Sequence, residues 1–213
     1  QIQPFTDAQI ALLQTFADQA VIAIENVRLF KELEARNREL VEALEQQTAT
    51  SEILRVISRS QTDVQPVFDA IAKTALRLCG AASSLVTIFD GEMIQLSAQA
   101  NIDPEGAEAY QRVYPLRPGR GFAAGRAILT CTIVHIADVH EDPEYEHRHL
   151  ARAAAFRSVL AVPMLRDGLP IGTINVHKAE TGPFTDNQVE LLRTFAAQAV
   201  IAIENVRLFN ETK

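Results

Sequence analysis

Apolar residues recur at helical spacing through the first quarter of the chain, and no glycine or proline interrupts them between Phe5 and Gln65. Thr6 or Asp7 is suited to cap the start of a helix, because either side chain can accept a hydrogen bond from a free backbone N–H. The pattern predicts one helix from about Asp7 to about Ser58. Such a length is unusual for a globular protein and indicates a coiled coil.

The second half of this helix carries its seam residues at alternating spacings of three and four, which is the heptad pattern. The heptad positions are Phe30, Leu33, Asn37, Leu40, Leu44, Gln47, Ser51 and Leu54. An asparagine such as Asn37 typically sets register and strand number at some cost in stability, and Gln47 and Ser51 weaken the middle of the seam. A solvated connector helix and a parallel dimer with a soft seam are both possible; we expect the dimer.

The end of the chain repeats its beginning. Residues 4–32 align without a gap onto residues 183–211, with 23 of 29 positions identical. A repeat of this kind indicates two copies of one structural unit. We therefore expect the closing helix of a preceding copy, then a coiled-coil linker, then one complete domain, with boundaries at 1–32, 33–60 and 61–213.

Between the two copies the pattern changes to short helices and strands in hairpins. Asp90-Gly91 and Arg166-Asp167-Gly168 are turn sequences that join two pairs of strand-like segments. Expected helices are 66–80, 103–114, 122–129 and 186–209, expected strands are 85–89, 93–98, 132–136, 158–165 and 171–177, and 140–155 is expected to be a loop that becomes helical. Antiparallel hairpins with helices at both ends of the domain predict an α+β fold.

The last expected strand has two different faces, because successive side chains of a strand point to opposite sides of a sheet. Ile174 and Val176 form an apolar face, which should meet the closing helix through Leu192, Phe195, Ala199 and Ile203. The opposite face, with Thr173, Asn175 and His177, suits a pocket, since ligand pockets have apolar walls with a few placed polar groups. In the first copy of the repeat this sheet is missing, so we expect Phe16, Ile22 and Ile24 to be exposed and to seek a partner.

Composition narrows the class of protein. Hydrophobic residues make up 47% of the chain and charged residues 22%, which is ordinary for a globular protein. A net charge of −7 argues against a nucleic-acid surface, and no apolar run approaches the roughly 18 residues of a membrane span. We expect a cytoplasmic protein without nucleic-acid or membrane partners. Cys79 and Cys131 have no metal-binding spacing, and Cys79 is expected to be a small buried apolar residue.

Four segments of the domain resemble the GAF domains of bacterial signalling proteins: 158–163 (SVLAVP), 170–175 (PIGTIN), 182–186 (GPFTD) and 198–205 (QAVIAIEN). The resemblance implies an antiparallel sheet of six, or sometimes five, strands. Terminal helices would cover one face of the sheet, and a lid of loops and helices would enclose a pocket on the other. It also implies dimerisation through the N- and C-terminal helices and a downstream output domain, a histidine kinase or a nucleotide cyclase.

GAF domains bind cyclic nucleotides, bilins, haem or amino-acid-like ligands, and comparison with these groups narrows the ligand. The Asn-Lys…Phe…Asp-Glu pattern of cyclic-nucleotide-binding members is broken here, because Asn175 and Lys178 are not adjacent and no Asp-Glu pair follows Phe184. Bilin-binding members need a cysteine near a histidine in the lid, and no cysteine follows Cys131. Methionine sulfoxide reductases of this fold use several cysteines in the pocket region. The two distant cysteines of this chain, Cys79 and Cys131, do not fit that arrangement. The ligand, and any cofactor, is left unidentified.

Two polar segments invite a chemical interpretation. Arg117–Arg126 has glycines and three arginines that could bind an anion at a helix start, but it is also typical of a tight lid turn. The segment 140–149 is rich in histidine and carboxylates, yet His147 and His149 are two residues apart and would turn to different sides of a helix. A solvated surface segment is the simpler interpretation.

We therefore expect a regulatory module without catalytic or metal-ligating residues, in which a lid of residues 101–157 closes over a small ligand. The expected ligand-binding residues are Phe122, Ile128, His135, Tyr145, Phe156, Ser158, Thr173 and Asn175. Binding would shift the sheet against the closing helix and pass a change to the output domain of a sensor histidine kinase. The alternatives are a ligand-free dimerisation spacer and a regulatory domain of a nucleotide cyclase.

Overall fold

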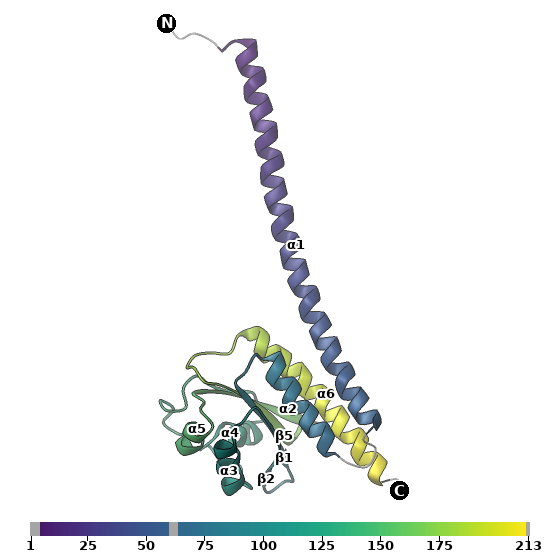
Figure 1. Ribbon diagram of the computed structural model, residues 1–213, viewed down its shortest axis with the longest axis vertical. Helices are drawn as coiled ribbons and strands as arrows, with labels where there is room; N and C mark the ends of the chain where they lie inside the picture. The colour runs from purple at the N-terminus through teal and green to yellow at the C-terminus, as the bar shows by residue number, and fades with distance from the viewer. Residues whose placement is uncertain (1–4, 60–63, 212–213) are drawn as a thin grey trace. The chain divides into compact units, whose positions relative to one another are not determined.

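The computed structural model describes residues 5–59 and 64–211, and the chain divides into two compact units, residues 1–45 and 46–213. A single helix, α1 (Asp7–Arg59), confirms the long predicted helix (Figure 1). Its start is capped reciprocally: the Thr6 N–H donates to Gln9 Oε1 and the Gln9 N–H donates to Thr6 Oγ1. This is the capping-box arrangement that satisfies the first free N–H groups of a helix. The side chain of Leu54, the last predicted heptad position, lies outside the described part of the chain.

The second unit is built on one antiparallel sheet of five strands in the order β2-β1-β5-β4-β3. The strands are β1 (Ser83–Phe89), β2 (Ile94–Ala100), β3 (Val134–Ile136), β4 (Ser158–Arg166) and β5 (Leu169–Lys178). The hairpins β1–β2 and β4–β5 are the two that the turn sequences predicted. Gly172 of β5 lies so close to the backbone of β1 that a Cβ there would collide with the Thr87 carbonyl, so only glycine fits this position.

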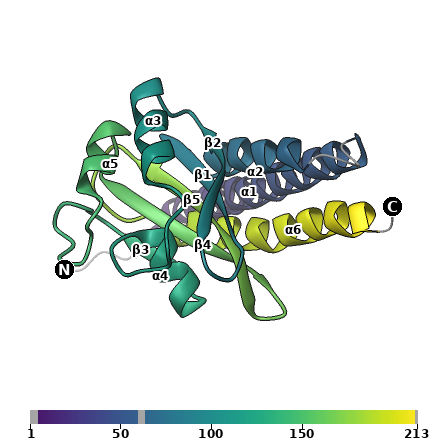
Figure 2. The same cartoon turned by 90° about the horizontal axis from the view of Figure 1, so that it is seen from below.

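Helices cover both faces of the sheet (Figure 2). On one face lie α2 (Gln65–Leu78) and α6 (Asp186–Glu211), side by side. On the other lie α3 (Pro104–Val113), α4 (Ala123–Thr130) and α5 (Arg148–Ala153). The architecture confirms the α+β class with terminal helices on one side and a lid on the other. Among the described residues, no helix combines the length and the apolar character that crossing a membrane requires.

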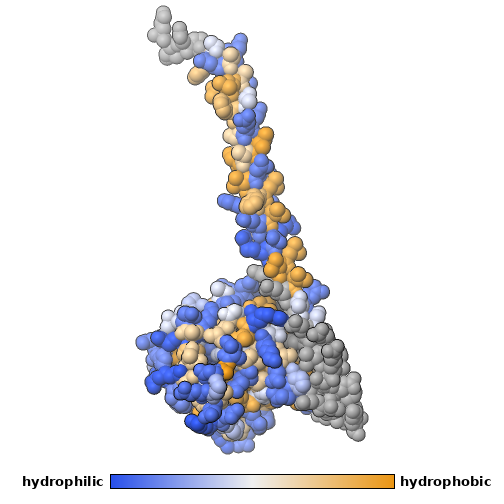
Figure 3. Space-filling view, in the orientation of Figure 1, coloured by the Kyte–Doolittle hydropathy of each residue, from blue (hydrophilic) through white to orange (hydrophobic). Residues whose placement is uncertain are grey.

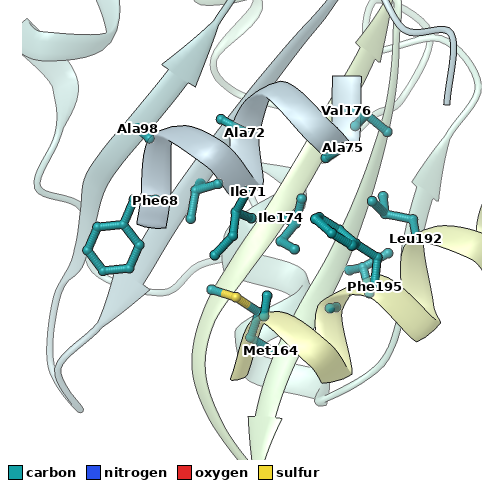
Figure 4. Packing of buried hydrophobic residues seen from close by; sticks show 14 of the residues in the cluster. Phe68, Ile71, Ala72, Ala75, Ala98, Met164, Ile174, Val176, Leu192 and Phe195 are labelled. Carbon is teal, nitrogen blue, oxygen red and sulfur yellow. The ribbon is translucent and has the colours of Figure 1, made fainter. Parts of the chain in front are cut away.

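A large apolar core joins the sheet to α2 and α6 (Figure 4). Ile174 and Val176 of β5 are fully buried against Leu192 and Phe195 of α6, as the alternation predicted. Ala199 and Ile203 complete this contact. Full burial of an aliphatic or aromatic side chain contributes about 1.5–3 kcal/mol, so this layer is the main source of stability for the domain.

The start of α6 is held by contacts that the sequence did not predict. Phe184 is 3% exposed and lies between the His135 ring and the Lys178 ammonium, which sits 4.2 Å from the centre of the Phe184 ring. Gln188 donates from its amide to the Cys79 carbonyl at 2.7 Å. These contacts fix where α6 begins on the sheet and on the end of α2.

Candidate functional site

The face of the sheet opposite α6 is covered by a lid that begins near Asn101 and ends near Ala155. Both residues have left-handed backbone conformations, with φ of 55° and 51°. Asparagine tolerates this region through local hydrogen bonding, and here its amide donates to the Ala82 carbonyl at 2.6 Å. The sharp turns at the two ends reverse the chain and bring the lid back over the sheet.

The lid is tied together by ion pairs between its two halves. Arg126 of α4 donates through both terminal nitrogens to the two carboxylate oxygens of Asp142, each at 2.7 Å. This bidentate contact holds the pKa of the Asp142 carboxyl below its ordinary value. Arg120 makes a second, exposed fork to Glu144, and the Glu146 N–H donates to the Gly121 carbonyl. The 117–126 segment is therefore joined to the 142–148 segment.

These ion pairs decide how the arginine-rich turn should be interpreted. Each of the three arginines that could have bound an anion is paired with a carboxylate: Arg117 with Glu92, Arg120 with Glu144 and Arg126 with Asp142. Gly125 approaches the backbone of Gly119 so closely that any larger residue would collide with it. The structure therefore favours a tight lid turn over an anion site.

Beneath the lid lies a narrow cavity of about 30 Å³. Its sheet side is formed by Leu85, Val159, Asn175 and His177, and its lid side by Tyr110, Tyr114, Leu116, Phe122, Ala123, Ala124, Tyr145, His147 and Leu150. None of these lining residues is an aspartate, glutamate, lysine or arginine. The cavity combines apolar walls with neutral polar groups, which is the composition of sites that bind uncharged small molecules.

Buried polar side chains of β1 and β5 lie on the lid side of the sheet, and two of them, Asn175 and His177, line the cavity. The Thr87 and Thr173 hydroxyls are hydrogen-bonded at 2.7 Å, and the Asn175 amide donates to the Thr173 hydroxyl at 2.9 Å. His177 contacts the Ser83 hydroxyl through Nδ1 at 3.1 Å. Burial of polar groups is costly unless they are paired, so a set of polar residues in an apolar layer is more typical of a functional site than of simple packing.

Burial keeps the ionisable groups of the cavity neutral. Loss of solvent lowers the pKa of His177 to about 3, and it also lowers the pKa of His147. The same effect raises the pKa of the phenols of Tyr110, Tyr114 and Tyr145. At neutral pH the cavity therefore offers phenol and imidazole groups in their uncharged forms.

The structure divides the eight predicted binding residues into three groups. Phe122, Tyr145 and Asn175 line the cavity. Ile128, Phe156 and Thr173 lie in the same layer behind the lining; the Phe156 ring, for example, stacks on His177 with ring centres 4.3 Å apart.

Ser158 and His135 lie on the opposite face of the sheet. Ser158 pairs in register with Lys178, whose ammonium reaches Gln188 of α6, and His135 accepts a hydrogen bond from the Phe184 N–H. Side chains alternate along a strand, so both residues face away from their neighbours Ile136 and Val159, which belong to the lid-side cluster. The structure does not bring these two side chains to the cavity.

Four polar residues of the cavity were missed as binding residues: Tyr110, Tyr114, His147 and His177. A signal for two of them was present, because Tyr110 and Tyr114 are four residues apart and so share one side of a helix. Alternation had already placed His177 on the pocket face of its strand, although it was not among the eight expected binding residues; its pairing with Val159 agrees with that placement.

Neither cysteine lines the cavity. Cys79 is fully buried in the core beside α6, where burial raises the pKa of its thiol to about 12 and makes it unreactive. Cys131 ends α4 in a left-handed conformation. Among the described residues, no cluster of three or more histidine, cysteine or acidic side chains is arranged to hold a metal ion.

A second hollow, an open groove of about 450 Å³, runs along the edge strand β2. Polar residues of α2, β2 and α3 line it, including Gln65, Asp69, Gln99 and Gln111. Tyr114 lines both the groove and the cavity under the lid, so its ring lies between the surface and the interior site.

Several solved structures share the fold of this domain. The GAF domain of a phosphoenolpyruvate-protein phosphotransferase from Coxiella burnetii superposes with a TM-score of 0.64, at 16% identity over 78% of this chain and 96% of that one. The free methionine-R-sulfoxide reductase from Neisseria meningitidis gives 0.61, at 19% identity over 78% and 92%. A domain of a putative two-component sensor histidine kinase from Sinorhizobium meliloti gives 0.55, at 15% identity over 68% and 94%.

The sequence itself matches the GAF domain family over residues 63–203. The chain therefore belongs to the GAF domain family, whose members are signalling and ligand-binding modules and are generally regulatory.

Proposed function

We propose that this GAF domain is a sensory module that binds a small, uncharged, hydrogen-bonding ligand in the cavity under the lid. The observation that supports it is the set of neutral polar residues in the lining, which are one asparagine, two histidines and three tyrosines among apolar residues. No aspartate, glutamate, lysine or arginine lines the cavity. A phosphate or carboxylate buried there would lack a cation, and burying an unpaired charge is strongly unfavourable. The lining therefore selects against charged ligands.

The closed cavity is too small for such a ligand. A volume of about 30 Å³ corresponds to about one water molecule. Binding then requires the lid to move, and the free energy of binding is coupled to the lid position. Tyr114 offers the route, because a displacement of its ring would join the open groove to the cavity.

The ligand signal would travel through the sheet to α6. The strands that carry Asn175 and Val159 on the cavity side carry Ile174 and Leu160 on the other, in the core that includes Leu192 and Phe195. A shift of β4 and β5 would change the position of α6, and a dimer formed through the terminal helices would pass it to an output domain. We propose a histidine kinase as that output; the likeness in fold to a domain of the putative sensor histidine kinase from Sinorhizobium meliloti supports this choice.

A ligand-free dimerisation spacer is the second candidate. The observation that favours it is the same small volume, since apolar side chains such as Phe122 and Leu150 already fill most of the space under the lid. A spacer would need the lid only as part of its core.

Binding can be tested with a panel of nucleobases, nucleosides and free amino acids, with cyclic AMP and cyclic GMP as charged comparisons. Thermal shift would report binding, and hydrogen exchange of residues 101–157 would report the lid. We expect at least one uncharged compound to raise the unfolding temperature and to change exchange in the lid. Asn175→Leu and Tyr145→Phe should abolish this effect.

The matched control is Ser158→Ala, which removes a fully buried hydroxyl from the opposite face of the sheet. This variant should keep full ligand response. If no compound binds, and Asn175→Leu leaves the unfolding temperature and the lid exchange unchanged or improved, the spacer is the correct function.

A further inference from the structure

The closing helix of the domain, α6, and the N-terminal arm (residues 5–45) carry the same residue at every buried apolar position of α6. The fully buried apolar positions of α6 are Leu192, Phe195, Ala196, Ala199, Val200, Ala202 and Ile203. The aligned arm positions are Leu13, Phe16, Ala17, Ala20, Val21, Ala23 and Ile24, and all seven residues are identical. The contact surface of α6 is thus present twice in the chain.

The two copies of this surface are in opposite environments. In α6, Leu192, Phe195 and Ile203 are 0%, 3% and 8% exposed. In the arm, Leu13, Phe16 and Ile24 are 57%, 59% and 70% exposed, and apolar residues are visible along the coloured part of the arm in Figure 3. An exposed apolar surface of this extent marks an interaction site.

The polar contacts of α6 are duplicated as well. Phe184, Gln188 and Glu204 bind the domain through Lys178, the Cys79 carbonyl and Arg166 respectively. Their arm counterparts are Phe5, Gln9 and Glu25. The arm also forms the same cap, since Thr185 and Gln188 exchange the hydrogen bonds that Thr6 and Gln9 exchange.

Six positions differ between the copies, and none of those with a described side chain is one of the seven buried positions. Four of them, Asn187, Glu190, Arg193 and Ala197, are exposed on α6. A fifth is the partly buried Val189, where the arm has isoleucine. The side chain of the sixth, Asn210, lies outside the described part of the chain. The described differences therefore lie on the exposed side of α6, apart from Val189, where one aliphatic residue replaces another at the edge of the core.

The arm has a second apolar stripe on its other side. At about 100° per residue, Ile22, Leu29, Leu33 and Leu40 lie about half a turn around the helix from the surface centred on Leu13 and Ile24. These four residues are 50–69% exposed and continue the heptad seam. One side of the arm can therefore bind a domain while the other side pairs with a second copy of the helix.

From this geometry we propose that residues 5–25 are the closing helix of a preceding GAF repeat in the same polypeptide. They would dock on a surface equivalent to the β4, β5 and α2 face under α6. That repeat would carry a cation where Arg166 stands, to pair with Glu25, and a cation beside the ring of Phe5. The proposal does not depend on a ligand, so its test is independent of any test of ligand binding in the cavity.

The first experiment exchanges the helices in place. The chain with Asn187→Ala, Val189→Ile, Glu190→Ala, Arg193→Gln, Ala197→Asp and Asn210→Lys carries the arm sequence on its own domain. We expect its thermal midpoint to stay within about 2 °C of the original, because all seven buried contacts are kept. The substitutions remove only the exposed Arg193–Glu190 ion pair and exchange valine for isoleucine at the edge of the core. Adding Phe195→Ala to this variant should lower the midpoint by about 10 °C, which shows that the exchanged helix is still docked.

The second experiment supplies the missing repeat. A fusion places residues 64–182 directly before Pro4 of the whole chain, so that the arm follows the added domain as α6 follows the original. We expect the added domain to resist proteolysis and to lose stability with Leu13→Ala and Phe16→Ala, but not with Ile22→Ala and Leu29→Ala on the opposite stripe. A loss of more than about 5 °C in the six-substitution chain overturns the proposal. So does a stable six-substitution chain combined with a protease-sensitive added domain.

Discussion

His177 is a buried histidine without a charged partner among the described residues; it lies between the Phe156 ring and the Ser83 hydroxyl under the lid. Burial lowers its pKa to about 3, so the folded protein keeps the ring neutral at pH values where the unfolded chain binds a proton. The group contributes nothing to pH dependence above about pH 6.5, its ordinary value. Below that the unfolded state binds more protons, and stability falls as the pH falls.

We predict that the domain loses stability between pH 7 and pH 5 by up to about 1.4 kcal/mol per pH unit below 6.5, chiefly through His177. His177→Gln keeps a hydrogen-bonding group for Ser83 and removes the titration, so its stability should depend less on pH. Urea unfolding at pH 5, 6 and 7 measures this. His149→Gln, on the exposed side of the lid, is the control and should follow the original chain. An equal pH slope in His177→Gln and the original would contradict the argument.

Some residues of the site could be predicted from the sequence and others could not. Alternation assigned Asn175 and Ile174 to opposite faces of β5, and both assignments are confirmed. It could not place Ser158, because the side on which the lid closes depends on which strands pair and in which register. Tyr110 and Tyr114 were passed over because the segment around them is polar, although a polar helix can still turn one aromatic side inward.

At the scale of elements, the predictable features were those encoded locally. The hairpin turns, the helix starts and the unbroken arm follow from glycine, proline and periodicity, and each is found within a few residues of its expected position. The expected strand at 132–136 is shorter, because Cys131 turns into the left-handed region and only Val134–Ile136 pair with β4. The ion pairs of the lid could not be predicted, since their partners are distant in sequence and charged residues have no periodic signature.

The pair between Arg126 and Asp142 should control how often the lid opens. We predict that Asp142→Asn speeds hydrogen exchange in residues 117–126 and 142–148 roughly tenfold, because the Arg126 guanidinium loses its bidentate partner in a partly buried position. Glu144→Gln, which breaks the exposed fork to Arg120, is the matched control and should change exchange little. Hydrogen exchange of the two variants is compared by mass spectrometry. Equal effects of Asp142→Asn and Glu144→Gln would show that burial of the Arg126–Asp142 pair is unimportant.

At the scale of the whole molecule, the arm should make the chain a dimer. The stripe of Ile22, Leu29, Leu33 and Leu40 offers a continuous apolar seam, and Asn37 lies beside it as a residue that favours a defined register. Sedimentation at tens of micromolar should give twice the monomer mass. Leu33→Asp with Leu40→Asp should give the monomer, because a buried pair of carboxylates in the seam is strongly unfavourable.

A matched variant on the other side of the arm tests whether the two stripes are independent. Leu13→Asp should leave the dimer intact, since Leu13 faces about half a turn away from the seam. Dissociation by Leu13→Asp, or a dimer that survives the double substitution at Leu33 and Leu40, would show that the chains associate through a different surface.

The duplicated closing helix suggests how proteins of this family can gain or lose domains during evolution. Residues 19–30 and 198–209 are letter-for-letter the same, so a cut within one and a join within the other restores an intact helix. Such an exchange would remove or add one whole GAF domain while leaving the helix at either end of it unaltered. Proteins with different numbers of GAF domains could thus arise by recombination at this point, without any new interface having to evolve.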